Sequence, residues 1–302
     1  MTALHTQDMH AAESAATTAA TTDANSAPKA RPITPRRMGF DMSLLQEKYF
    51  FGGNSILSAL MYALSASFPD GERFFIDSVR HYQKDIKDPA LVDQIRGFIG
   101  QEAHHSRTHE EFNAQAKNVG MAMDAVDKHF KRRIGMARRR FSPAQQLAIT
   151  AALEHITATL AQWTLENPQV VSGDQQSPLR EMLIWHAMEE IEHKAVAFDV
   201  YRAAVNDETL RIRTAKIIFR TFWIQMAIAQ ATLLWHDRKI PSLREIREAW
   251  DFMWGKQGMR TWATPELNKY LQPGFHPNDI DQSQLLKEWN ASYPDVAAMQ
   301  IA

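Results

Sequence analysis

The chain has no cysteine among its 302 residues. It therefore has no disulfide, no zinc–thiolate site and no cysteine nucleophile. Any metal site has to be built from histidine and carboxylate side chains, which suit iron, manganese or zinc.

An excess of charge of either sign is also missing. The chain has 34 Lys and Arg against 35 Asp and Glu, a formal net charge of −1, and its basic residues are scattered. This balance argues against nucleic acid or an anionic membrane as the main partner. A composition that is 45% apolar is enough to bury a large core.

Large apolar residues are scarce in residues 1–36, where Ala, Thr, Ser and Asp dominate. The segment lacks the basic start and the apolar stretch of a secretory signal, and the absence of Arg before Arg31 disfavours a transit peptide. We expect a disordered tail here and take the cytoplasm as the default location.

No alternating strand pattern appears after Phe40, and the remaining sequence has helical periodicity. Ser142-Pro143 and Ser177-Pro178 place a capping serine before a proline at the first helical position. We expect an apolar segment that stops at Phe68-Pro69-Asp70-Gly71. The segments expected to be apolar or helical are 54–67, 70–86, 89–118, 142–167, 177–205 and 210–235.

The predicted fold is all-α: a ferritin-like four-helix bundle over residues 40–205, with additional C-terminal helices over residues 206–302 as a cover. The segment 210–235 contains an apolar stretch shorter than the ~20 residues of a bilayer span, and Gln225 and Gln230 interrupt it. We expect it to be a buried or interfacial helix, with membrane contact the less favoured alternative.

Two predicted helices carry histidine and glutamate on one apolar face. Residues three, four or seven apart share a helix face. Glu102, His105 and His109 have these spacings in one helix, and the other helix repeats them. The second set is His186, Glu190 and His193.

Two further helices each offer one carboxylate within an apolar face, Glu72 and Glu154. Burying so many ionisable groups is prohibitive unless they are paired or bind cations. One Glu from each of two helices and a Glu-x-x-His from each of the other two is the arrangement of di-iron and di-manganese bundle proteins. The sequence therefore predicts a two-metal site. Its expected ligands are Glu72, Glu102, His105, Glu154, Glu190 and His193.

His109 and His186 exceed this set of six, and two roles stay open for them. Each either binds a metal directly, as a seventh ligand or at a third metal position, or hydrogen-bonds a ligand carboxylate. Glu189 is a weaker candidate at the edge of the same face. Three residues point away from the ligand faces and are expected to be structural or solvated, namely His104, His155 and Glu192.

Three segments resemble the bacterial family described as "predicted metal-dependent hydrolase". They are Phe68-Pro69-Asp70-Gly71-Glu72-Arg73-Phe74-Phe75, Phe98-Ile99-Gly100-Gln101-Glu102-Ala103-His104-His105-Ser106 and Pro273-Gly274-Phe275-His276-Pro277. The resemblance extends over residues 40–289, and the family name implies hydrolysis. The ligand pattern itself looks more like that of ferritin-like di-iron oxygenases.

We give the ligands more weight than the name and expect an oxidoreductase with two irons per chain, or three, that uses O₂ to oxidise a small organic or aromatic substrate. Manganese and zinc are the alternative metals. The alternative functions are a two-metal hydrolase and a non-catalytic metal-binding protein. Expected partners are the substrate, O₂, an external electron donor and a second copy of the chain, with no nucleic acid.

Overall fold

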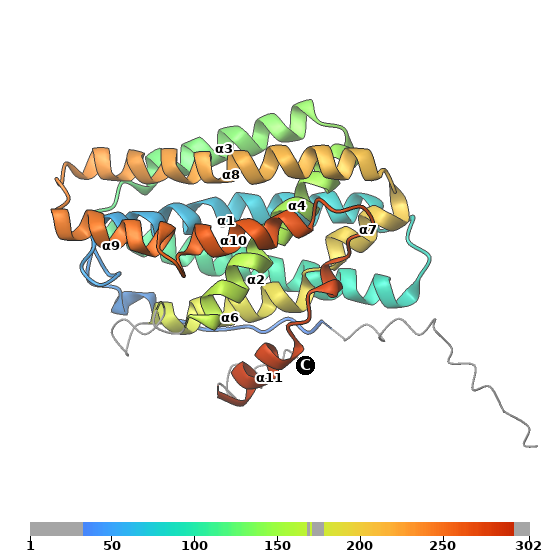
Figure 1. Cartoon of the computed structure of the whole chain (residues 1–302), viewed down its shortest axis with the longest axis horizontal. Helices are drawn as coiled ribbons and strands as arrows, with labels where there is room; N and C mark the ends of the chain where they lie inside the picture. Colours follow the sequence, from blue (N-terminus) through green and yellow to red (C-terminus); the bar gives the residue numbers. More distant parts are fainter. Residues whose placement is uncertain (1–32, 168–169, 171–177, 293–302) are drawn as a thin grey trace, which may run out of the picture. The chain divides into compact units, whose positions relative to one another are not determined.

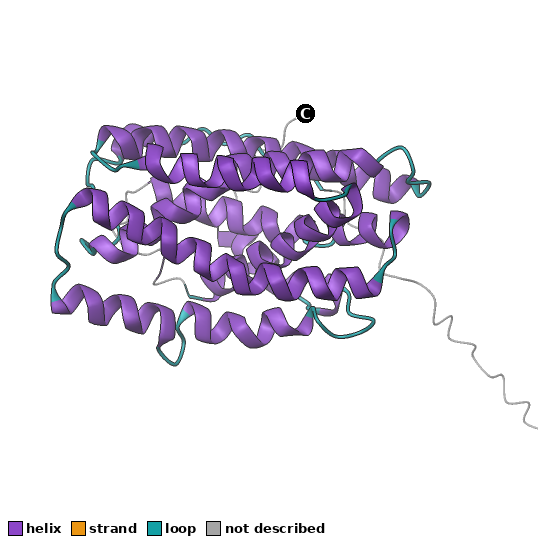
Figure 2. Ribbon diagram, turned by 90° about the horizontal axis from the view of Figure 1, so that it is seen from above, coloured by secondary structure: helices purple, strands orange, loops and turns teal. Residues whose placement is uncertain are grey.

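The computed structural model describes residues 33–167, 170 and 178–292. Figure 2 shows helices joined by loops and no strand in this part of the chain. The predicted all-α class is confirmed, while the ferritin-like arrangement and the predicted domain boundaries stay predictions. The predicted tail, up to residue 32, lies outside the described residues.

Four helices form the centre of the fold. Their bounds are Ser55–Tyr82 (α1), Pro89–Asn118 (α2), Pro143–Glu166 (α4) and Pro178–His193 (α6). Helix α1 packs along α2 and against α4, and α6 packs against α4 and α2, so each helix has two neighbours among the four (Figure 1). The side chains of Asn54, Asp88 and Ser142 cap the first three helices. Ser177, the predicted cap of the fourth, lies outside the described residues.

Helix α1 runs without a break through Pro69, where the sequence predicts a stop. A proline inside a helix removes the N–H that would bond the carbonyl four residues earlier. Here that carbonyl belongs to Ser65, and the Asn113 side-chain amide donates to it at 3.1 Å. The prediction of two segments was wrong because α2 supplies the missing donor.

The second prediction that the structure corrects is one helix over residues 177–205. The chain forms α6, which ends at His193, and a separate helix α7, Val196–Ala204. Between them Lys194 donates to the carbonyl of Ile280 and to the Gln282 side chain. A further helix, α3 (Met123–Arg140), was not predicted and packs against α1.

The C-terminal helices pack onto the central four. Helix α8 (Glu208–Asp237) lies along α1 and α4, and α9 (Leu243–Trp254) contacts α1. Helix α10 (Met259–Lys269) contacts α4, and α11 (Ser283–Ser292) contacts α4 and α6. Short 3₁₀ helices occupy Met42–Leu44 and Pro277–Asp279.

Within the described residues, α8 is the one helix long and apolar enough to cross a membrane, judged by length and composition. Two polar residues within its apolar stretch hydrogen-bond to the bundle. Gln230 donates to the carbonyl of Ile56 in α1, and Gln225 bonds His129 in α3. These bonds tie α8 to its neighbours, as expected for a helix of the bundle.

Residues 33–36, at the end of the predicted tail, lie against α2 and α6. A Cβ at Gly97 would overlap the carbonyl oxygen of Ile33, and one at Gly100 would overlap the Pro35 ring. The two glycines therefore allow the segment to approach α2 closely. This approach places Arg36 beside α6, where its side chain is almost completely buried.

Candidate metal centre

The four central helices bring the six predicted ligands together in the protein interior. Helix α1 supplies Glu72, α2 supplies Glu102 and His105, and α4 supplies Glu154, with the last two from α6. All six side chains are buried, none more than 4% exposed: Glu72, Glu102, His105, Glu154, Glu190 and His193. The fold thus gathers every residue of the predicted set, although their role as ligands stays a prediction.

Their donor atoms form overlapping groups small enough to hold metal ions. One atom from each of Glu102, Glu154, Glu190 and His193 lies within 4.8 Å of the others, and the same holds for Glu72, Glu102 and His105. Glu102 belongs to both groups. Glu190 also belongs to a third group with His105 and His186, and Glu72 belongs to a fourth with His109 and His186. The arrangement fits two neighbouring metal positions with Glu102 and Glu190 between them.

Most of these donor atoms have no hydrogen-bond partner. Unpartnered are both oxygens of Glu72, Glu102 and Glu154 and one oxygen of Glu190. Nδ1 of His105 and Nε2 of His193 also lack a hydrogen bond, although Nε2 of His193 lies 3.1 Å from Oε1 of Glu102 and 3.3 Å from Oε2 of Glu154. A buried polar atom without a partner costs several kcal/mol, and an unpaired buried charge costs more. Bound cations would remove this cost, so the residues present fit a metal centre.

Electrostatics support the same conclusion. Burial, with repulsion from Glu102 next, raises the pKa of Glu72 well above its usual value. Burial and repulsion from Glu154 do the same to the pKa of Glu102. Burial also raises the pKa of Glu154 to about 7. Glu190 differs: although burial opposes it, the neighbouring His193 and His186 hold its pKa well below its usual value. Without cations the centre therefore favours protonation of the other three carboxyls, whereas nearby cations would favour carboxylates.

The second ring nitrogen of each predicted histidine ligand is held by a neighbouring side chain. Nδ1 of His193 lies 2.9 Å from Oε1 of Gln101, and Nε2 of His105 lies 3.0 Å from Oε2 of Glu189. These bonds turn the free nitrogen of each ring toward the carboxylates. Metal-binding histidines typically have such an orienting partner on the other nitrogen.

A buried charge network supports the two orienting residues. Arg36 donates to Glu189 at 3.1 Å through both its backbone and its side chain, and it also pairs with Glu192 at 2.6 Å. Gln101 donates to Glu192 at 3.0 Å. No role was predicted for Arg36 or Gln101 from the sequence. Gln101 could have been found, because it lies four residues before His105 and so shares its face.

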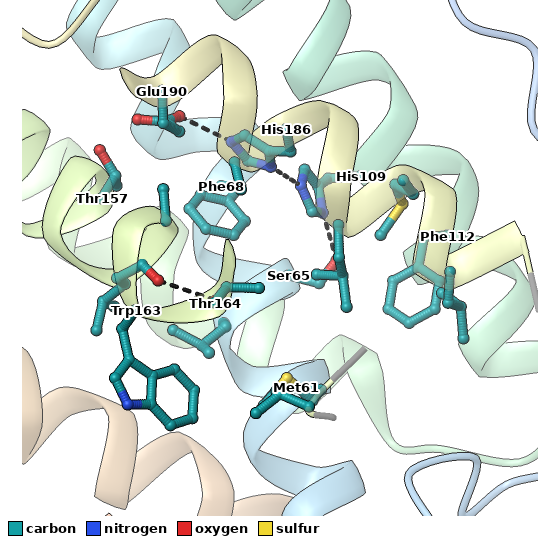
Figure 3. A pocket seen from close by; sticks show the side chains of 18 of the residues that line it. Met61, Ser65, Phe68, His109, Phe112, Thr157, Trp163, Thr164, His186 and Glu190 are labelled. Carbon is teal, nitrogen blue, oxygen red and sulfur yellow. Dashed lines mark hydrogen bonds and ion pairs between the residues drawn. The ribbon is translucent and has the colours of Figure 1, made fainter. Parts of the chain in front are cut away.

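His109 and His186 form a hydrogen-bonded chain at one side of the centre (Figure 3). Nε2 of His186 is 2.8 Å from Oε1 of Glu190, and its Nδ1 is 2.7 Å from Nε2 of His109. Nδ1 of His109 is 2.8 Å from Oγ of Ser65. All four ring nitrogens thus have partners, unlike those of the six-residue set. Direct ligation by either ring stays a prediction, and in this arrangement it requires the loss of one of these bonds.

Asn113 sets the direction of this chain. A backbone carbonyl only accepts, so the amide nitrogen of Asn113 faces the Ser65 carbonyl, and its Oδ1 accepts the Ser65 hydroxyl hydrogen at 2.7 Å. Ser65 Oγ then accepts from Nδ1 of His109. A neutral His109 accepts at Nε2 from His186, which leaves a neutral His186 without a hydrogen on its own Nε2. The bond between His186 and Glu190 therefore has to contain one further proton.

A cavity of about 110 Å³ lies beside this chain. Figure 3 shows His186, His109 and Ser65 along one side of the cavity and Phe68 next to His186. Helix α4 contributes several further lining residues and α8 contributes Phe222, and most of the lining is aliphatic or aromatic. Glu190 contributes to the cavity and to the carboxylate cluster, so it joins the two.

Fold and site together define an all-helical protein with a buried carboxylate–histidine centre suited to metal ions. The chain belongs to the family described as "predicted metal-dependent hydrolase", whose family model matches residues 34–281. No curated protein and no solved structure matches the chain.

The family assignment corrects the functional prediction. The oxygenase hypothesis ranked the ligand pattern above the family name, but histidine and carboxylate ligands serve hydrolytic as well as redox metals. The family matches the hydrolase alternative instead. The expectations of iron, O₂ and an electron donor depended on the oxygenase hypothesis, so they no longer hold. A metal-dependent protein remains, and the metal's identity does not follow from the buried clusters.

Proposed function

We propose that this protein is a hydrolase that uses two metal ions bound by Glu72, Glu102, His105, Glu154, Glu190 and His193. One observation supports the proposal above all: the buried donor atoms of these six residues, most of them without partners, point to a shared centre. Membership in a family predicted to be metal-dependent hydrolases supplies the reaction class.

The grouping of the donor atoms indicates how the residues would divide. Glu72 and His105 would bind on one side of the centre, and Glu154 and His193 on the other, with Glu102 and Glu190 between them. When bound, a pair of divalent ions lowers the pKa of water and polarises the bond to be hydrolysed.

The His186–Glu190 pair is placed to handle a proton. The donor and acceptor roles along the hydrogen-bonded chain require one proton between Nε2 of His186 and Oε1 of Glu190. His186 also borders the cavity. A proton held there can pass to the leaving group as the bond to it breaks. Nε2 of His109 accepts from Nδ1 of His186, and Oγ of Ser65 accepts from Nδ1 of His109. These two hydrogen bonds hold the His186 ring in place.

The metal-loaded enzyme tests this proposal. The protein is stripped with a chelator, reloaded separately with zinc, manganese or ferrous iron under nitrogen, and assayed against carboxylic esters, amides and phosphate esters. At least one metal should restore hydrolysis without O₂.

Two variants locate the activity. Glu154→Gln should abolish it, because Glu154 is fully buried in the centre. The matched control is Glu111→Gln, a half-exposed glutamate on α2 paired with Arg107, and it should keep full activity. Hydrolysis that survives complete metal removal, or survives in Glu154→Gln, contradicts the proposal.

A further inference from the structure

The cavity beside His186 has the size and lining of a binding site for a small apolar group. Its polar side chains are few. Ser65, His109, His186 and Glu190 bond one another, and the hydroxyls of Thr157 and Thr164 donate to backbone carbonyls of α4. Among the described residues, no lysine or arginine lines it. A charged group placed there would lose its hydration without gaining a partner of opposite charge.

The cavity volume limits what fits. At about 110 Å³ it is of the same order as a dry apolar cavity of roughly 150 Å³ that binds benzene. Aromatic and aliphatic side chains from four helices face it, among them Phe112, Leu160, Met182 and Phe222. An aromatic ring or a short branched alkyl group fits this space, whereas a sugar or a phosphate finds no partners there.

We infer that the cavity binds the apolar group of an uncharged ester or amide, with the bond to be hydrolysed at the Glu190 end. This inference rests on the proposed function and names its substrate class. In the reaction, the water oxygen bonds to the acyl carbon and the bond from that carbon to the leaving atom breaks. One water hydrogen stays on the new acid, and the leaving atom takes up the other proton.

The cavity can be filled by replacing a small side chain in its wall with a larger one. Ala161 lines it from α4 and is buried. Ala161→Leu adds three carbon atoms to that wall. Ala227 is an exposed alanine on α8, so Ala227→Leu is the matched control. Leu183→Ala should enlarge the cavity instead, because Leu183 also lines it.

The experiment measures binding and hydrolysis separately. Benzene binding to the metal-loaded protein is followed by ligand-observed NMR, and hydrolysis is compared for phenyl acetate and 4-acetoxybenzoate, which differ by one charge. Benzene should bind the wild type and Ala227→Leu equally and Ala161→Leu at least tenfold more weakly. Phenyl acetate should be hydrolysed at least tenfold more efficiently than its charged analogue, after division by the rates with hydroxide alone.

The outcomes are distinguishable. Benzene binding that Ala161→Leu weakens, without hydrolysis of any ester or amide, supports the cavity and overturns the proposed hydrolase. Hydrolysis with no preference for the uncharged ester overturns the substrate class and leaves the hydrolase standing. If Ala161→Leu does not fold, Leu183→Ala decides, because it should bind naphthalene more tightly than the wild type does. No benzene binding by the wild type overturns the inference.

A different observation supports a second inference, about the outer surface of α8 and the segment after it. Trp235 is 82% exposed, Ile240 90% and Leu243 86%. Ile224 and Ile228 continue the exposed apolar surface along α8. Only 22% of the most apolar stretch of α8 is buried. Exposed apolar surface of this extent marks an interaction site.

The charges in this segment indicate the partner. From residue 217 to residue 250 the basic residues are Arg220, Arg238, Lys239, Arg244 and Arg247. The three acidic residues in the same range have partners: Asp237 pairs with Lys48, Glu245 with Lys239 and Glu248 with Arg244. With five basic and three acidic residues the segment has a formal charge of +2, whereas the chain as a whole has a net charge of −1.

We propose that residues 217–250 bind the surface of an anionic membrane. Exposed tryptophan and isoleucine enter the lipid headgroup region, and the basic side chains face the anionic headgroups. The opposite face of α8 stays on the bundle through Phe219, Met226 and Leu233, so the helix lies on the membrane rather than across it. A second copy of the chain would place these basic segments against each other. The near-zero net charge of the whole chain argues against a membrane partner, but it averages over this positively charged segment.

Vesicle co-sedimentation tests the second inference. The full chain should sediment with vesicles of phosphatidylcholine and 30% phosphatidylglycerol, and at least fivefold less with phosphatidylcholine alone or in high salt. Trp235→Ser with Ile240→Ser should lower binding at least fivefold. Leu44→Ser, at an exposed leucine outside the segment, should not. Equal binding to both vesicles, or a dimer that the double variant converts to a monomer, overturns the inference.

Discussion

The replacement of Arg36 by methionine should destabilise the protein through the charge that it leaves behind. The Glu189 side chain is 0% exposed and that of Arg36 is 6% exposed, so the pair is shielded from solvent. Burial raises the pKa of Glu189, and the nearby Arg36 opposes this shift. Removal of one partner from a buried ion pair typically costs about 3–5 kcal/mol. We expect a loss of about 3 kcal/mol, since the backbone N–H of residue 36 still donates to Glu189.

The assay is urea unfolding of the metal-free protein in a double-mutant cycle. Arg36→Met and Glu189→Gln should each destabilise, and the double variant should be more stable than the sum of the single effects by about 1–3 kcal/mol. Arg36→Met should also weaken metal binding by about tenfold, because Glu189 orients His105. An Arg36→Met variant within about 0.5 kcal/mol of the wild type, or strictly additive effects, would refute this reasoning.

Three further predictions concern the packing, the hydrogen-bond chain and the pH dependence. Gly97→Ala should lower the free energy of unfolding by about 1–3 kcal/mol, because the new Cβ would meet Ile33. The control Gly71→Ala, whose Cβ would have nothing within 4 Å, should not destabilise the protein. Equal urea midpoints for the two variants would contradict the close approach of Ile33 to α2. His109 should carry its hydrogen on Nδ1, as the hydrogen bonds of Asn113 require. A ¹⁵N NMR measurement that places this hydrogen on Nε2 would contradict the assigned directions of the hydrogen bonds. Burial lowers the pKa of His155 from its ordinary value of 6.5 to about 3. Its stabilising contribution is therefore complete above about pH 6.5 and is lost as the pH falls, by about 2 kcal/mol at pH 5. His155→Phe should lose that much less stability than the wild type between pH 7.5 and pH 5, and parallel losses would contradict the assignment.

Much of the site could be predicted because helical spacing is a local property. Glu102 and His105 share a face at any rotation of α2, and the apolar residues on that face show that it turns inward. The starts of α2 and α4 follow in the same way from Asp88-Pro89 and Ser142-Pro143. Such features depend only on residues a few positions apart.

Features that depend on distant residues could not be predicted in this way. The passage of α1 through Pro69 needs Asn113 from α2, and the packing of residues 33–36 needs Gly97. Arg36 acquires a role only because Glu189 lies beside it in space, 153 residues away in sequence. Even the function depended on chemistry beyond spacing, because the same ligand set serves redox and hydrolytic metals.

The number of metal ions per chain tests the central claim most directly. Stripped protein is reloaded with a single metal, dialysed and measured by mass spectrometry, with Glu102→Ala, Glu190→Ala and the control Glu111→Gln in parallel. The account predicts two ions per chain in the wild type and the control, and loss of most bound metal from Glu102→Ala and Glu190→Ala, whose carboxylates lie between the two positions. A wild-type chain that binds no metal, or variants that keep both ions, would contradict it.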